Sequence, residues 1–479
     1  MTPDQPHPTR FRAEVKVISG HPGNAVVGNH LASQDRAVSD DGALGHAISR
    51  ARRRLVPFLL LMYIISFLDR ANIGFAKQAL ETHAGISPRV YALAAGLFFL
   101  SYAAFELPSN LILHLVGARI WMARIMVTWG LVSMATMFVV GSRSFYTLRL
   151  LLGAAEAGFF PGVILYLTYW FPNRARAQIF GLFYFGAPLA FIFGGPISGL
   201  LLQMNPVGNL QNWQWMFLVE GSLAVAVGIW SYSYLDNRPA DANWLPSEEK
   251  NALANALSNE ENRQHSHSRS HSPAKLLPML RDSHLLHFVL IYFFLQMSVY
   301  GVVFYLPSEV SALMHKPAGF EVGLVSAIPW ICALAGAFWL PRLADALNQR
   351  RRIAALTLAI AACASFLFPL AGPRAGLMAL AGLIALSVAA TGLIAVQPLF
   401  WTFPTNYLSD RAAAGGLAMI NALGAVGGFV APNVKVWADE HFGSQQAGLY
   451  LLALVTILNA GLIALIRTQP RTQTAPKEV

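Results

Sequence analysis

The sequence predicts an all-α membrane protein with twelve transmembrane helices arranged in two six-helix bundles. Three observations support this prediction. Of the 479 residues, 55% are hydrophobic and only 12% are charged, whereas a soluble domain usually has about 25% charged residues. The apolar residues are concentrated in runs of about 20, the helix length that crosses the hydrocarbon core of a bilayer. A long polar segment then divides these runs into two sets of six.

Each predicted span is a mostly apolar stretch that ends at polar or charged residues. In chain order, the spans are roughly 55–76, 90–114, 119–141, 146–171, 178–203, 213–235, 285–310, 321–341, 352–372, 375–401, 410–436 and 446–467. The resulting domains are a disordered cytoplasmic tail (1–50), an N-terminal bundle (51–235), a cytoplasmic central loop (236–284), a C-terminal bundle (285–467) and a cytoplasmic C-terminal tail (468–479).

Lys and Arg residues are concentrated in alternate loops between the predicted spans. With the N-terminus in the cytoplasm, the inner loops contain Arg50, Arg52, Arg53, Arg54, Arg119, Arg124, Arg174, Arg176, Arg342, Arg350, Arg351 and Arg352. Cytoplasmic loops of membrane proteins are enriched in Lys and Arg, so we expect both termini and the central loop on the cytoplasmic side. The same enrichment accounts for the formal net charge of +10, and we expect no nucleic-acid partner.

The two halves of the chain repeat one pattern. Thr168–Pro172 reads TYWFP at the end of the fourth span, and Phe400–Pro404 reads FWTFP at the end of the tenth. A glycine-rich helix follows in both cases. Parallel repeats of this kind are typical of transporters that build a central site between two bundles.

Four stretches resemble the anion:cation symporter family of major facilitators: Leu61–Ala76, Phe105–Arg119, Leu148–Pro172 and Asn212–Gly221. The resemblance covers about residues 50–467 and is strongest to bacterial tartrate and phthalate permeases. D-galactonate permease and the vesicular glutamate and sialic-acid carriers are more distant. It implies a monomeric inner-membrane transporter that takes up a small organic anion, a carboxylate, with protons by alternating access.

Adjacent charges lie near the end of the first span, at Asp69 and Arg70. Neighbours on a helix point about 100° apart, so the two side chains cannot share one face. Either the span ends early and both lie in water, or Arg70 faces a central cavity, where its planar fork can bind a carboxylate. The resemblance favours the second alternative, with Arg70 binding substrate and Asp69 as a protonatable site.

Arg149 and Glu156 are two helical turns apart in the fourth span and therefore share a face. They are either an ion pair that neutralises itself or part of the proton path. A buried carboxyl and a neighbouring arginine have opposing effects on protonation. Substrate arrival or bundle movement could therefore load and release a proton at Glu156. The resemblance implies proton-coupling roles for Glu156 and Arg149.

Two further acids are assigned gating or structural roles. Glu106 lies near the inner end of the second span, within Glu106–Asn110, and we expect it to act in helix packing or gating. Asp345, with Arg350–Arg352, partly matches a loop motif of the resembled family. The corresponding first-half loop, Leu115–Arg119, lacks the aspartate.

The resemblance implies three substrate-binding residues beyond Arg70: Tyr102 in the second span, Trp401 in the tenth and Asn421 in the eleventh. Tyr and Trp are also common at membrane interfaces, and an asparagine can simply bridge helices. Weaker candidates are Gln296, Tyr300 and Gln397. A glutamine of the galactonate relatives has no counterpart in Phe183–Pro188, which leaves a more apolar wall suited to an aromatic or smaller acid.

Other classes of function are less well supported. His265, His267 and His271 form a His/Ser run in the central loop, which we interpret as a solvated linker rather than a metal site. No phosphate-binding, zinc or nucleophile motif is evident, so we expect no cofactor and no enzyme. An organic anion exchanger or exporter of the same fold stays open, as does a membrane receptor that binds ligand without translocation.

Overall fold

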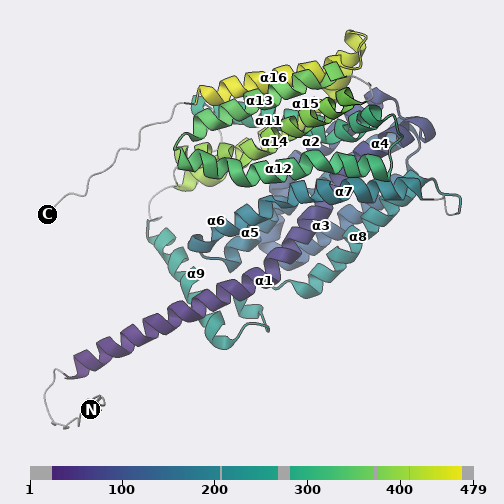
Figure 1. The fold of residues 1–479 in the computed structure, drawn as a ribbon. Coiled ribbons are helices and arrows are strands. Elements are labelled where there is room, and N and C mark those ends of the chain that lie inside the picture. The colour runs from purple at the N-terminus through teal and green to yellow at the C-terminus, as the bar shows by residue number, and fades with distance from the viewer. Residues whose placement is uncertain (1–23, 205–207, 268–280, 372–375, 409, 467–479) are drawn as a thin grey trace, which may run out of the picture.

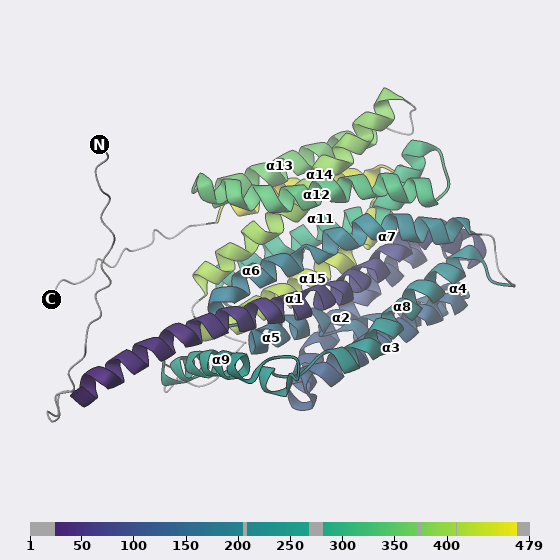
Figure 2. The same cartoon turned by 60° about the horizontal axis from the view of Figure 1, so that its bottom comes forward.

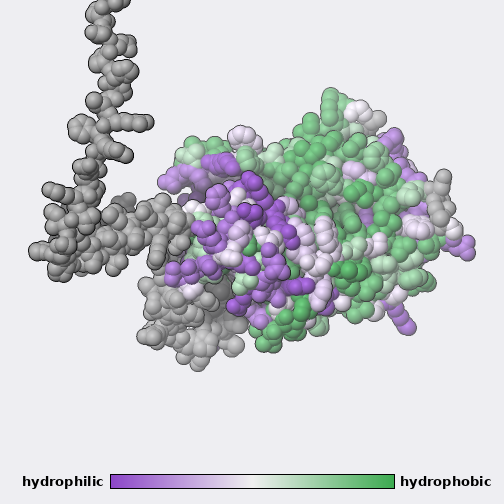
Figure 3. All heavy atoms as spheres, turned by 90° about the horizontal axis from the view of Figure 1, so that it is seen from below, coloured by the Kyte–Doolittle hydropathy of each residue, from purple (hydrophilic) through white to green (hydrophobic). Residues whose placement is uncertain are grey.

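The computed structural model describes residues 24–204, 208–267, 281–371, 376–408 and 410–466 (Figure 1). Within these ranges, twelve helical stretches are long and apolar enough to cross a membrane. The prediction of an all-α, twelve-span protein is therefore confirmed. Large hydrophobic side chains such as Ile229, Trp339 and Phe366 are exposed, as expected for a surface that contacts lipid. In the view of Figure 3, hydrophobic residues cover broad areas, and hydrophilic residues gather on the left of the molecule.

In the part of the N-terminal half that the structure describes, eight α-helices form six spans. Their bounds are α1 (Asn24–His83), α2 (Pro88–Val116), α3 (Ala118–Ala135), α4 (Gly141–Glu156), α5 (Phe159–Trp170), α6 (Asn173–Tyr184), α7 (Gly186–Gln203) and α8 (Asn212–Tyr234). Local sequence sets several of these ends. The Ser87 side chain caps α2 by accepting from the backbone N–H of Val90 at 3.3 Å, and Pro88 occupies the first turn, where its missing N–H is not needed.

The described residues of the C-terminal half form six spans, each a single helix: α11 (Ser283–Met314), α12 (Phe320–Ala346), α13 (Arg350–Ala371), α14 (Leu377–Tyr407), α15 (Asp410–His441) and α16 (Ala447–Ala464). Asp282 caps α11 by accepting from the backbone N–H of His284 at 2.9 Å. Figures 1 and 2 show these helices grouped beside the N-terminal ones, with α7 next to α12 where the two bundles meet.

The fourth span is broken in its middle, a feature that the sequence analysis did not predict. Helix α4 ends at Glu156, and α5 begins at Phe159. Gly158 lies between them with φ = +84°, a conformation that favours glycine. A side chain on Gly158 would also collide with Ser109 of α2. The break leaves Glu156 at the end of a half-helix, which is where transporters commonly form their sites.

Glycines allow the two bundles to touch at one end of their interface. Gly195 and Gly199 of α7 pack on Gly323 of α12 and on Gly319 just before it, so closely that an added Cβ on either α7 glycine would collide with the facing backbone. Helix α2 approaches α15 in the same manner at Gly96, next to Phe429. These contacts seal one end of the interface because small residues let helix backbones approach each other.

Two segments contain more helix than predicted. Helix α1 begins at Asn24, so part of the predicted 1–50 tail continues the first span. The central loop contains α9 (Ser247–His267), which packs on α1. Glu249 of α9 pairs with Arg50 of α1 at 3.0 Å. Residues 1–23, the central-loop residues 268–280, which include His271, and the tail from 467 onward lie outside the described residues.

Candidate functional site

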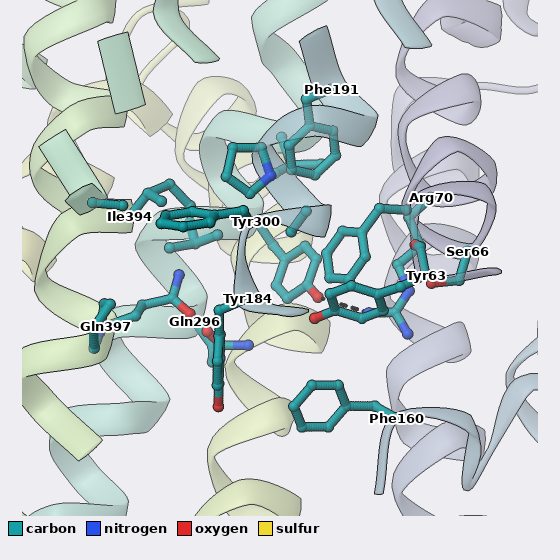
Figure 4. Close-up of a pocket in the computed structure, with 18 of the residues that line it drawn as sticks. Tyr63, Ser66, Arg70, Phe160, Tyr184, Phe191, Gln296, Tyr300, Ile394 and Gln397 are labelled. Carbon is teal, nitrogen blue, oxygen red and sulfur yellow. Dashed lines mark hydrogen bonds between the residues drawn. The ribbon is translucent and has the colours of Figure 1, made fainter. Parts of the chain in front are cut away.

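A cavity of about 490 Å³ lies between the two bundles. Its wall is largely aromatic: Tyr63, Phe67, Phe98, Phe99, Tyr102, Phe159, Phe160, Tyr184, Phe185, Phe191, Tyr292, Tyr300 and Phe338 line it. Figure 4 shows Arg70 and Ser66 on one side of the cavity and Gln296 and Gln397 on the other. The cavity therefore has a cation on one side and neutral amides on the other, within a largely aromatic wall.

Arg70 is the largely buried cation of the cavity wall, and its guanidinium faces Glu156. Its Nε donates to Glu156 Oε1 at 3.1 Å, and Nη2 contacts the same oxygen. Its Nη1 donates to the hydroxyl of Tyr300 at 3.1 Å, across the interface between the bundles. The Arg70 side chain is 11% exposed and that of Glu156 is 1% exposed. Arg70 thus lies at the cavity surface, with a buried carboxylate behind it.

Aromatic rings surround the Arg70 guanidinium. Its central carbon lies 4.8 Å from the ring centroid of Phe67 and 5.3 Å from those of Phe98 and Tyr102. Ring faces stabilise cations at such distances. Tyr102, a predicted binding residue, therefore borders both the cavity and the cation.

Asp69 points away from the cavity, into the core of the N-terminal bundle. Its carboxylate accepts from Asn72 Nδ2 at 2.9 Å and also from Trp129 Nε1 and Ser133 Oγ of α3. It does not line the cavity. The adjacent residues Asp69 and Arg70 are therefore separated by the helix itself, as their 100° offset requires.

Arg149 belongs to α4, and its side chain packs against α2. It does not line the cavity either. Its Nε donates to the backbone carbonyl of Ala94 at 3.4 Å, and its Nη2 is buried without a hydrogen-bond partner among the described residues. The Phe98 ring lies 5.0 Å from its guanidinium carbon. The ion pair of Glu156 is with Arg70 rather than with Arg149, so the self-neutralising pair considered from helical spacing is absent from the described structure.

Glu106 and Asn421 join the two bundles. Asn421 Nδ2 of α15 donates to Glu106 Oε1 of α2 at 3.0 Å, and Asn421 lines the cavity. The other Glu106 oxygen is buried without a partner in the part of the chain that the structure describes. A predicted binding residue and a predicted gating residue are thus in direct contact.

Trp401 and Asp345 lie away from the cavity surface. The Trp401 ring is 4.9 Å from that of Tyr292, which lines the cavity, so Trp401 lies one layer behind the wall. Asp345 pairs with Arg350 at 2.5 Å between α12 and α13, and both are exposed. The three weaker candidates, Gln296, Tyr300 and Gln397, all line the cavity.

Several lining residues were not singled out from the sequence, including Tyr63, Tyr184, Tyr292 and Gln178. Arg342 also lines the cavity, although the sequence analysis counted it only as an inner-loop charge. Aromatic residues within apolar spans give no signal that separates a cavity wall from a lipid-facing surface. Among the described residues, no cluster of His, Cys, Asp and Glu could hold a metal ion.

Comparison with known protein families gives a match to the Major Facilitator Superfamily over residues 59–432. The chain is 43% identical to the inner membrane transport protein RhmT of Escherichia coli over 424 residues, which are 88% of this chain and 96% of RhmT. It is 39% identical to a putative tartrate transporter of Agrobacterium vitis, over 92% of this chain and 96% of the relative. A quinolone resistance transporter of Acinetobacter baumannii is 38% identical, over 86% and 92% of the two chains.

Solved structures with a similar fold include the xylose transporter XylE of E. coli in its inward open conformation. It aligns with a TM-score of 0.68 at 13% identity, covering 88% of this chain and 97% of XylE. A bacterial homologue of the human lysosomal transporter Spinster aligns with a TM-score of 0.66 at 15% identity, covering 86% and 96% of the two chains. At these identities, the likeness concerns the fold.

Proposed function

The chain belongs to the major facilitator superfamily and is therefore a membrane transporter rather than an enzyme; from this premise, we propose that it takes up a small organic anion together with protons. The observation that carries the proposal is the Arg70 guanidinium at the surface of a cavity between the bundles, surrounded by aromatic rings. A planar guanidinium matches the geometry of a carboxylate and can bind it through two parallel hydrogen bonds.

Proton coupling follows from competition for Arg70. Glu156 occupies part of the guanidinium fork, so a substrate carboxylate and an ionised Glu156 would compete for the same donors. A proton on Glu156 removes its charge and frees Arg70 for the substrate. Leaving a buried charge unpaired is strongly destabilising, so proton binding and anion binding favour each other, as linked equilibria must.

Alternating access explains how both ligands would cross the membrane. The cavity reaches the exposed residues Gln178 and Arg342 at one end, while glycine contacts between α7 and α12 close the other end. With the orientation that the Lys and Arg distribution predicts, the open end faces the cytoplasm. This structure would then be the inward-open state, in an inner membrane with both termini cytoplasmic. All the site residues come from one chain, and we propose a monomer.

The shape of the cavity favours a monocarboxylate with a planar or apolar body. One buried guanidinium binds one carboxylate, and the aromatic wall can cover the remainder of the molecule. Gln296 and Gln397, opposite Arg70, can hydrogen-bond a polar substituent. Aromatic acids fit this description best. Sugar acids and tartrate-like dicarboxylates are the alternatives, the latter in keeping with the name of one relative.

Two measurements test the proposal. A thermal-shift screen of the purified protein against the three classes of acid identifies the substrate, because a ligand that binds the folded state raises its stability. Uptake of that acid into proteoliposomes is then measured with and without an imposed pH gradient. We expect accumulation only with the gradient. Accumulation that is unchanged after the gradient is collapsed would show that the transporter is not a proton symporter.

Export or exchange is the second candidate function. The relative named for quinolone resistance favours it. Net accumulation distinguishes the alternatives: a symporter accumulates labelled acid in empty proteoliposomes when a pH gradient is imposed, whereas an exchanger takes it up only against unlabelled acid loaded inside. Ligand binding with neither activity would indicate a receptor.

A further inference from the structure

A polar cluster lies in the core of the N-terminal bundle, away from the substrate cavity. It comprises Asp69 and Asn72 of α1, Ser198 of α7 and Glu220 of α8, none of which lines the cavity. All four are at most 5% exposed. Ser198 Oγ donates to Glu220 Oε1 at 2.7 Å. The transport mechanism proposed above makes no use of Glu220.

Asn72 links the two acids of this cluster. Its side-chain amide donates to Asp69 Oδ1 at 2.9 Å and lies close to the Glu220 carboxyl. Among the described residues, Asp69 is the charged neighbour of Glu220 on the helices packed against α8, and Arg149 of α4 is in turn a charged neighbour of Asp69. Among the described residues, neither acid forms an ion pair with Lys, Arg or His.

The cluster lacks hydrogen-bond donors. Glu220 Oε2 and Asn72 Oδ1 are both buried acceptors without a partner among the described residues. A buried acceptor that is left unsatisfied costs about 1–3 kcal/mol, and more when it is charged. A proton on Glu220 removes the charge and converts one acceptor into a donor. The observed arrangement therefore suits a neutral carboxylic acid.

We propose that Glu220, linked to Asp69 through Asn72, is a second proton-binding site that exchanges its proton with the medium without touching the substrate. The proton binds to a carboxylate oxygen as an O–H bond forms, and no other bond changes. A role of Glu220 in transport rests on the proposed symport, whereas proton binding by Glu220 does not depend on it. The cluster joins α1, α7 and α8, so its protonation can alter how these helices pack.

Infrared spectroscopy of the detergent-solubilised protein tests proton binding directly. We expect the wild type to show a carbonyl stretching band of a protonated carboxylic acid that diminishes as pH rises, and Glu220→Gln to lack that band. The matched control is Ser198→Ala, which removes the donor to Glu220 and should shift the band without abolishing it. A spectrum identical in wild type and Glu220→Gln, or a band that does not respond to pH, overturns the proposal.

A transport assay tests the role of Glu220 in coupling separately from the proposed symport. In proteoliposomes, we expect Glu220→Gln to lower the ratio of protons to substrate and to flatten the pH profile of uptake. An unchanged ratio and profile overturn the coupling role of Glu220. If the wild type itself moves no protons, the proposed symport fails, and the infrared titration of the same protein still decides whether Glu220 binds an exchangeable proton.

Discussion

The N-terminal bundle places ionisable residues at mid-span, at Asp69, Arg149, Glu156 and Glu220, each at most 5% exposed. The polar side chains by which the C-terminal bundle lines the cavity are mainly neutral, such as those of Gln296, Gln397 and Asn421. A charge within a bilayer costs at least about 2.5–3.5 kcal/mol on insertion scales, so residues of this kind need a compensating role.

This difference suggests a division of labour between two bundles of similar architecture. Protonation changes the charge of the N-terminal bundle, whereas the amides of the C-terminal bundle keep their hydrogen-bonding pattern at any ordinary pH. We therefore expect substitutions of the buried acids Glu156 and Glu220 to affect coupling, and those of the C-terminal amides to affect recognition, while Arg70 serves the substrate directly.

Arg70→Lys should have the largest effect on uptake. Lysine keeps the charge but loses the planar fork. Hydrogen bonds to charged groups are each worth about 1.5–3 kcal/mol, so we expect uptake to fall roughly 10- to 100-fold. Initial rates in proteoliposomes measure this loss. Arg342→Gln is the matched control, because Arg342 is an exposed residue at the cavity rim. Equal losses in both variants would contradict a special role for Arg70.

Glu156→Gln should separate proton coupling from transport. Glutamine resembles the protonated acid, so Arg70 stays free for substrate whatever the pH. We expect gradient-driven accumulation to be lost while counterflow exchange continues, and both are measured with labelled substrate. Glu106→Gln serves as the control, since Glu106 contacts Asn421 instead of Arg70, and it should keep its response to the gradient. Full accumulation by Glu156→Gln would remove Glu156 from the coupling role.

Asn421→Ala should weaken recognition and leave coupling intact. The substitution removes a cavity amide and its 3.0 Å hydrogen bond to Glu106. A loss of about 1.4 kcal/mol corresponds to a roughly tenfold rise in KM. Uptake at varied substrate concentration gives KM, and proton flux gives the coupling ratio, which we expect to be unchanged. A changed ratio would break the proposed division between the bundles.

Trp401→Phe should have the smallest effect. Trp401 packs behind Tyr292 rather than against the cavity, and phenylalanine keeps most of the ring contact. We expect KM to stay within about twofold of the wild type, because the change is made behind the wall and the surrounding aromatic residues are kept. A Tyr292→Leu variant, which alters the wall itself, should show a larger change. A larger change in KM for Trp401→Phe than for Tyr292→Leu would instead indicate that Trp401 contacts the substrate.

The sequence was sufficient to predict the twelve spans, because span length and apolar composition follow directly from bilayer thickness. Helical spacing also indicated that Asp69 and Arg70 diverge. It did not identify Arg70 as the partner of Glu156, since spacing reports only neighbours on one helix, and these residues are 86 positions apart. The break at Gly158 was not predicted, because a single glycine in an apolar run can equally well lie within a continuous helix. Glu220 and Asn72 lie on different helices, and their proximity depends on the packing of the bundle.

Helix α1 runs without interruption from Asn24 to His83, past both its contact with α9 and the cavity. At 1.5 Å per residue, Arg50 lies about 30 Å along the helix from Arg70. The helix is continuous between them and contains Pro57, so a small tilt of the whole helix at the cavity gives a larger displacement at its far end. The Arg50–Glu249 contact is therefore a natural position for a remote reporter of the transport cycle, one that leaves the binding site untouched.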